Sequence, residues 1–172
     1  MSSSFKCATC GQEHSGLPFD YSFGLPDEVF ELDFLSRYQR TRSNSDLCTL
    51  DGSRFFIRGL IPLPFLDSTD EFGWGIWVEV SRGDHDKYLG GYYEDLSGEP
   101  RFSGKLACSI PGYSETLGID VEIAFGAKGQ RPSFHVAASL PHALADDQHK
   151  GLTPARHHEL LEAVGHFKRH TA

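Results

Sequence analysis

The stretch Phe72-Gly73-Trp74-Gly75-Ile76-Trp77-Val78-Glu79-Val80-Ser81 organises the rest of this sequence, because it holds both tryptophans of the chain. Side chains of a β-strand alternate between its two faces, so Trp74 and Trp77 point to opposite sides. Large aromatic side chains on both faces predict a central strand that is covered on both sides. Gly73 and Gly75, next to the tryptophans, leave room for a neighbouring backbone to approach.

Length and composition favour one globular domain over residues 1–172, with residues 1–16 as a knuckle-like N-terminal segment packed on it. The chain is 39% apolar and 23% charged, and no apolar run approaches the roughly 20 residues of a membrane span. The start of the chain lacks the basic and apolar regions of a secretory signal, which predicts a cytoplasmic protein with no membrane partner. A net charge of −8 opposes binding to nucleic acid.

The pattern beyond the tryptophan stretch predicts an α+β fold, with an antiparallel sheet of about five or six strands and flanking helices. One helix is expected from Asp27 to about Tyr38, and Asp51-Gly52 is a turn dipeptide between two strands. The second strand should end or reach a sheet edge at Pro62 and Pro64, which have no N–H to donate. The other elements are predicted by periodicity and caps. They are a helix within 83–96, strands at 102–110, 117–125 and 132–138, and helices at 141–149 and from 153 onward.

The most specific local motif is Cys7-x-x-Cys10-Gly11 followed by His14. Zinc prefers thiolate and imidazole ligands in a tetrahedron, and two cysteines at this spacing can bind one ion. We therefore predict a structural Zn²⁺ site formed by Cys7, Cys10 and His14, with Cys48 as the best remaining thiol. Cys108 is the weaker choice because it lies in an apolar strand.

Other interpretations of the cysteines remain open. A redox Cys-x-x-Cys normally opens a helix directly after a strand, whereas only a short segment precedes Cys7 and Pro18 follows soon after it. A disulfide conflicts with the reducing compartment expected of a chain without a secretory signal. The cysteines can also be small buried side chains with no metal.

Histidines crowd the last third of the chain. In the helix from 153 onward, His157 and His158 accompany the apolar residues Leu160 and Leu161, and we expect most of the histidines on its polar face toward solvent. No second histidine follows His158 at the spacing of a metallohydrolase motif. Arg131-Pro132 and the segment from His142 are polar insertions beside apolar strands, and we expect them to line a groove or to bind loop backbone.

Several segments together resemble an uncharacterised bacterial family, domain-of-unknown-function family 2199. They are Cys7-x-x-Cys10-Gly11-x-x-His14, Asp46-Leu47-Cys48, Phe56-Ile57-Arg58-Gly59, Trp74-Gly75-x-Trp77-Val78, Pro111-Gly112-Tyr113, Arg131-Pro132, and His142 with Gln148 and Gly151. The resemblance spans nearly the whole chain and implies no particular activity. The family pattern includes the three thiols together with His14, which supports one joint metal site.

Three functions follow from these observations as hypotheses. The leading one is a binding or interaction module, with a zinc ion that clamps the N-terminus to the first hairpin and with a protein as its partner. A metal-dependent hydrolase or other small enzyme, using His14 or His142 at an open zinc position, is the alternative in another class. The acidic charge also suits an immunity-type protein that neutralises a basic toxin.

Overall fold

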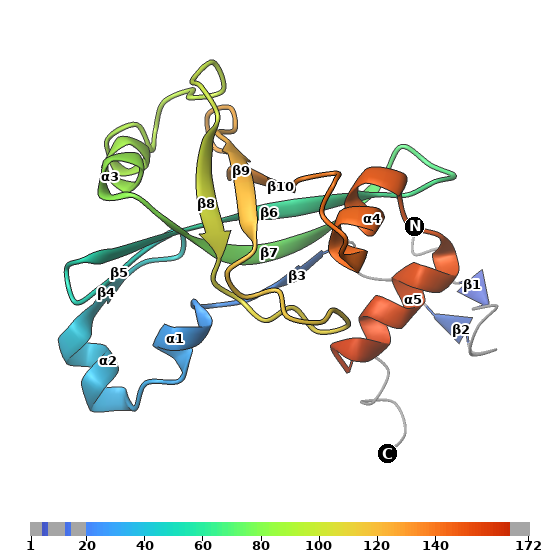
Figure 1. The fold of residues 1–172 in the computed structure, drawn as a ribbon, viewed down its shortest axis with the longest axis horizontal. Coiled ribbons are helices and arrows are strands. Elements are labelled where there is room, and N and C mark those ends of the chain that lie inside the picture. The colour runs from blue at the N-terminus through green and yellow to red at the C-terminus, as the bar shows by residue number, and fades with distance from the viewer. Residues whose placement is uncertain (1–4, 7–12, 15–19, 166–172) are drawn as a thin grey trace.

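The computed structural model describes residues 5–6, 13–14 and 20–165 (Figure 1). In these residues the chain forms a mixed sheet, a small separate hairpin and short helices. The elements, in order, are β1 (Phe5–Lys6), β2 (Glu13–His14), β3 (Asp20–Ser22), α1 (Asp27–Phe30), α2 (Phe34–Arg40), β4 (Thr41–Ser43), β5 (Leu47–Leu50), β6 (Arg54–Pro64), β7 (Glu71–Val80), α3 (Arg82–Gly90), β8 (Phe102–Leu106), β9 (Asp120–Ala124), β10 (Ser133–Val136), α4 (Ala143–Lys150) and α5 (Pro154–Ala163).

The tryptophan stretch forms β7, and both tryptophans are fully buried, at 0% exposure. Trp77 donates its indole N–H to the carbonyl of Phe23 at 3.0 Å, so the segment after β3 covers this face. Gly75 lies against β3, where an added Cβ would come within 2.5 Å of the Ser22 hydroxyl. The prediction of a central strand that is covered on both faces and closely approached by a neighbouring backbone is therefore confirmed.

The sheet differs from the predicted open antiparallel sheet because five of its strands close into a barrel. The strand order β7-β8-β9-β10-β6 returns to β7, since β6 pairs with β7 as well as with β10 (Figure 1). Among the described strands, β10 runs parallel to β6 and β3 runs parallel to β7, so the sheet is mixed. Apolar and polar residues alternate along a strand in the same way in a barrel and in an open sheet, so the sequence pattern does not distinguish the two.

Gly59 marks the point at which the barrel closes. A Cβ at this position would lie 2.5 Å from the ring of Phe134 and 2.5 Å from the carbonyl oxygen of Pro132. The next residue, Leu60, donates its backbone N–H to that same carbonyl at 2.9 Å. The absent side chain of Gly59 therefore lets β6 and β10 meet, with the Phe134 ring packed between them.

The hairpin at Asp51-Gly52 forms as predicted, with φ of 55° and 63° at these two residues. β6 ends at Pro64, as expected from the two prolines, although Pro62 and Pro64 are still in register with β7. Both prolines are at positions whose missing N–H would point away from β7, as the N–H of Leu60 does. Their carbonyls accept hydrogen bonds from the Gln148 side chain and from the backbone N–H of Leu152, respectively.

The single helix predicted from Asp27 to Tyr38 is wrong, because α1 ends at Phe30 and α2 begins anew at Phe34. Asp33 begins α2 by accepting a hydrogen bond from the backbone N–H of Ser36 at 3.0 Å. The guanidinium of Arg37 donates to the carbonyls of Val29, Phe30 and Leu32 and so satisfies the end of α1.

α4 and α5 cover one end of the barrel (Figure 1). Gln148 fixes α4 to β10, since it accepts from the N–H of Val136 at 2.8 Å and donates to the carbonyl of Phe134 at 2.9 Å.

The expectation of solvent-facing histidines is wrong for His157 and His158, which are 5% and 1% exposed. Aromatic side chains at this end of the barrel cover α5 next to its leucines, and the centroid of the His157 ring lies 5.2 Å from that of Phe72. In the described part of the chain, every helix is too short or too polar to cross a bilayer.

Candidate functional site

The candidate site is built around Asp46, a buried carboxylate in the turn between β4 and β5. Asn44 fixes this turn, because its side-chain oxygen accepts hydrogen bonds from the backbone N–H groups of Asp46 and Leu47, both at 2.8 Å. The carbonyl of Asp46 accepts the backbone N–H of Arg58 from β6 at 2.9 Å. Asp46 is only 5% exposed, so its negative charge requires partners.

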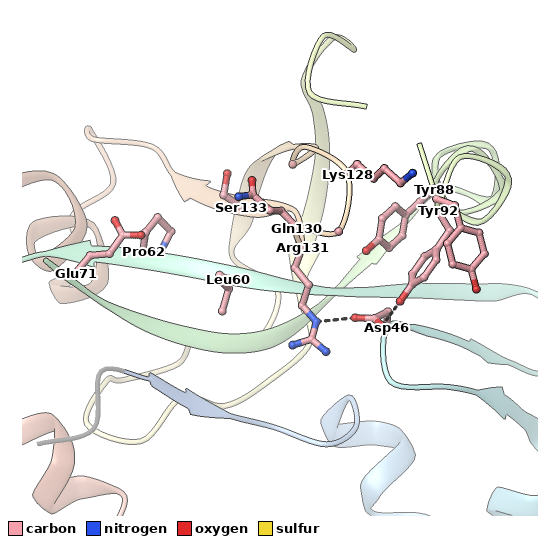
Figure 2. A pocket seen from close by; sticks show the side chains of 13 residues that line it. Asp46, Leu60, Pro62, Glu71, Tyr88, Tyr92, Lys128, Gln130, Arg131 and Ser133 are labelled. Carbon is pink, nitrogen blue, oxygen red and sulfur yellow. Dashed lines mark hydrogen bonds and ion pairs between the residues drawn. The ribbon is translucent and has the colours of Figure 1, made fainter. Parts of the chain in front are cut away.

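Three donors surround the Asp46 carboxylate, and Figure 2 shows two of them, Tyr92 and Arg131. The Tyr92 hydroxyl donates to Oδ2 at 2.6 Å, and the Ser45 hydroxyl donates to the same oxygen at 2.8 Å. Arg131 donates its Nε–H to Oδ1 at 2.6 Å. Burial opposes ionisation, but these donors outweigh it and hold the pKa of Asp46 below its usual range. The hydrogen bond to the carboxylate raises the pKa of Tyr92.

A second arginine, Arg58, lies near the same carboxylate. Its guanidinium is centred 6.0 Å from the Trp77 ring, and Nη1 donates to the carbonyl of Ser45 at 3.3 Å. Its Nε is buried and has no hydrogen-bond partner among residues 20–165. Burial, and then the nearby charge of Arg131, lowers the pKa of Arg58. Arg131 thus binds the Asp46 carboxylate directly, and Arg58 adds a second positive charge near it.

An open cleft of about 760 Å³ lies beside this cluster. It extends along the outer side of β6, with Pro62 and Glu71 toward one end and Tyr88 and Tyr92 toward the other, as Figure 2 shows. Arg131 lies between these two ends, and its guanidinium reaches down to Asp46. A space of this size matches the usual range of small-molecule pockets, about 300–1,000 Å³.

The Arg131 part of the expected groove is present, but His142 is elsewhere. His142 begins α4, where its Nδ1 accepts the backbone N–H of Leu144 at 3.0 Å, and its other ring nitrogen contacts the carbonyl oxygen of Ser114. The segments Asp46-Leu47-Cys48, Phe56-Ile57-Arg58-Gly59 and Arg131-Pro132 meet around Asp46, although they are far apart in the sequence. Neither the buried position of Asp46 nor its bond with Tyr92 has a local sequence signal.

Only part of the predicted zinc site falls within the described residues. Cys7 and Cys10 lie outside the described residues, as does the side chain of His14, so this part of the zinc site stays a prediction. Figure 1 shows β2, which carries His14, beside α5, whereas β5 with Cys48 lies at the opposite end of the molecule. Within residues 20–165 and the two described pieces of the N-terminal hairpin, no group of three or more potential metal ligands occurs.

The two thiols of the described region are core side chains. Cys48 and Cys108 are both 0% exposed, and neither forms a disulfide. Burial raises the pKa of the Cys48 thiol to about 11 and that of the Cys108 thiol to about 12. In the absence of a metal ion, both therefore stay protonated at neutral pH, a state that does not attack an electrophile.

The fold and the cleft define a small barrel protein of α+β composition with an arginine-lined surface site. Residues 6–152 match the model of a family described as an uncharacterized protein conserved in bacteria (DUF2199), and the chain belongs to that family. This match confirms the resemblance seen in the sequence. No curated protein and no solved structure matches the chain.

We predict that Asp46→Asn lowers the free energy of unfolding at neutral pH by roughly 2–3 kcal/mol, because two guanidinium groups lose their buried counter-charge. In the wild type, the pKa of Asp46 is lower in the folded than in the unfolded state. The carboxylate therefore stabilises the fold fully above the unfolded-state pKa of about 3.9, and this stabilisation is lost as the pH falls through the folded-state pKa. The variant should therefore lose less stability than wild type on acidification. Urea unfolding across an acidic pH series measures both effects.

Asp120→Asn is the matched control, since Asp120 pairs with Lys105 at 2.6 Å but its side chain is 82% exposed. It should change the free energy of unfolding by less than about 0.5 kcal/mol. Equal losses in the two variants, or an unchanged acid dependence in Asp46→Asn, would contradict a buried ionised Asp46.

Proposed function

We propose that the protein is a binding module and that its ligand occupies the cleft beside Asp46. One observation carries the proposal: a guanidinium held by a buried carboxylate faces an open cleft that is also lined by tyrosines. A polar group fixed before the ligand arrives costs less conformational entropy on binding. Aromatic walls with a few placed polar groups are the usual composition of small-molecule sites.

The state of the titratable groups favours binding over acid–base catalysis at this site. A general base works best when its pKa is near the working pH, whereas the pKa of Asp46 is lowered. Its oxygens already accept three hydrogen bonds. Tyr92 has a raised pKa and donates a hydrogen bond to Asp46, so it stays protonated and is equally unsuited to accept a proton. These groups supply fixed charge and shape to a ligand.

The binding module also holds, in this proposal, one structural zinc ion near its N-terminus. Cys7, Cys10 and His14 are its ligands, and the support is the Cys-x-x-Cys-Gly-x-x-His spacing together with the preference of zinc for sulfur and nitrogen. Cys48, which the family pattern adds to this set, is left as a core thiol because of its burial and its distance from β2 in Figure 1. The fourth zinc ligand then comes from elsewhere.

We predict that small-molecule ligands found by an amide-detected NMR screen of a fragment library bind in the cleft. The signals of residues 126–133 and of Tyr92 should shift together on binding. Tyr93→Ala should weaken these hits, because Tyr93 lines the cleft and its ring packs against Tyr92 at 5.1 Å. Tyr38→Ala, on α2, is the matched control, since the two tyrosines are 80% and 74% exposed. Hits that map elsewhere, or no hits, would contradict the proposal.

For the metal, we predict one zinc equivalent per chain in untagged protein, measured by native mass spectrometry with elemental analysis. Cys7→Ser should lose the ion because a thiolate ligand is removed, whereas Cys48→Ala should keep it. Loss of zinc should leave the barrel folded, because a chain of this size has its own core. A metal-free wild-type protein would refute the zinc site, and zinc loss in Cys48→Ala would restore Cys48 as a ligand.

A further inference from the structure

The geometry points to an anionic group, a phosphate or a carboxylate, as the part of the ligand that the cleft recognises through Arg131 and Lys128. This inference rests on the proposed function and adds the chemical class of the ligand. Both side chains line the cleft and come from the turn between β9 and β10. In Figure 2, Lys128 is directed toward Tyr88 and Arg131 toward Asp46, and both lie away from the end of the cleft that carries Glu71.

Away from Glu71, the two cationic side chains that line the cleft, Arg131 and Lys128, face one carboxylate, that of Asp46. Asp46 accepts one hydrogen bond from Arg131, through Nε, and the two Nη groups of Arg131 have no hydrogen-bond acceptor within residues 20–165. Lys128 forms no ion pair within those residues, and its side chain is exposed. Arg58 adds a third cation near Asp46, with an unpartnered buried Nε. This local surplus stands out on a chain with a net charge of −8.

The fixed orientation of Arg131 suits an oxyanion. A guanidinium presents its donors in a planar fork that matches carboxylate and phosphate oxygens. Because Asp46 holds Nε at 2.6 Å, the plane of the fork is set before a ligand arrives. Lys128, on a flexible stem, can then approach the same anion as a point charge.

The other lining residues limit the rest of the ligand. Tyr93 is 80% exposed and offers a ring face beside Tyr92, which suits a planar group attached to the anion. Glu71 lies toward the opposite end of the cleft, where its carboxylate would repel a second anionic group. The site therefore fits a ring-bearing ligand with a single anionic group better than an extended polyanion.

Benzoate and phenyl phosphate test the inference, with benzamide and benzylamine as the neutral and cationic counterparts of the same ring. In amide-detected NMR titrations, the two anions should shift the signals of residues 126–131 and Tyr93, and the counterparts should bind much more weakly. Lys128→Glu should weaken anion binding by at least about tenfold because an attraction becomes a repulsion. Binding should also weaken at about 0.5 M salt, which screens exposed charges.

Lys150→Glu is the matched control, because the Lys150 side chain is 77% exposed on α4 and does not line the cleft. It should bind both anions as wild type does. Equal binding of benzylamine or benzamide, or unchanged anion affinity in Lys128→Glu, would overturn the anionic class. If neither anion binds while the fragment screen yields cleft ligands, the class is wrong and the binding module stands. A screen without cleft ligands rejects the proposed function itself.

Discussion

The ionised carboxylate of Asp46 is the interaction on which the site depends. It joins the β4–β5 turn to Tyr92 after α3 and to Arg131 before β10. Burying an ion pair gains little net stability, because desolvation offsets the attraction, but removing one partner leaves an uncompensated buried charge. The carboxylate thus fixes which segments meet. Without it, Arg58 and Arg131 would repel each other in one partly buried space.

The barrel places this carboxylate and its partners with little freedom. Arg131 directly precedes Pro132, whose carbonyl accepts the N–H of Leu60 where the barrel closes. The missing side chain of Gly59 permits that approach. The packing of Phe134 against β6 therefore sets the position of the Arg131 backbone. Asp46, in turn, is held by the backbone N–H of Arg58 on the same strand. Hydrogen bonds to β6 thus hold two of the segments that line the cleft, the one with Asp46 and the one with Arg131.

Local features of the sequence predict local structure well here. The alternation around Trp74 and Trp77 identifies β7, and Asp51-Gly52 identifies the hairpin because both residues need positive φ. Thr153 and Pro154 correctly mark the start of α5, where the Thr153 side chain accepts the N–H of Arg156.

Features that depend on distant partners could not be predicted in this way. Barrel closure needs the contact between Gly59 and Phe134, and the burial of His157 needs the aromatic rings of Phe65 and Phe72. At the site, the sequence indicates a polar role for Arg131 but not its partner. Asp46 and Arg131 are separated by 85 residues, and the sequence around Tyr92 predicts only a helix. No periodicity relates residues that meet only when the barrel has closed.

A double-mutant cycle of Asp46→Ala and Arg131→Ala tests the central claim most directly. If the carboxylate and the guanidinium form one interaction that holds the site, the losses in the free energy of unfolding are not additive, and the coupling energy exceeds about 1 kcal/mol. Additive losses, within about 0.5 kcal/mol, would show that the two side chains stabilise the fold independently and that Asp46 does not position Arg131 in the cleft.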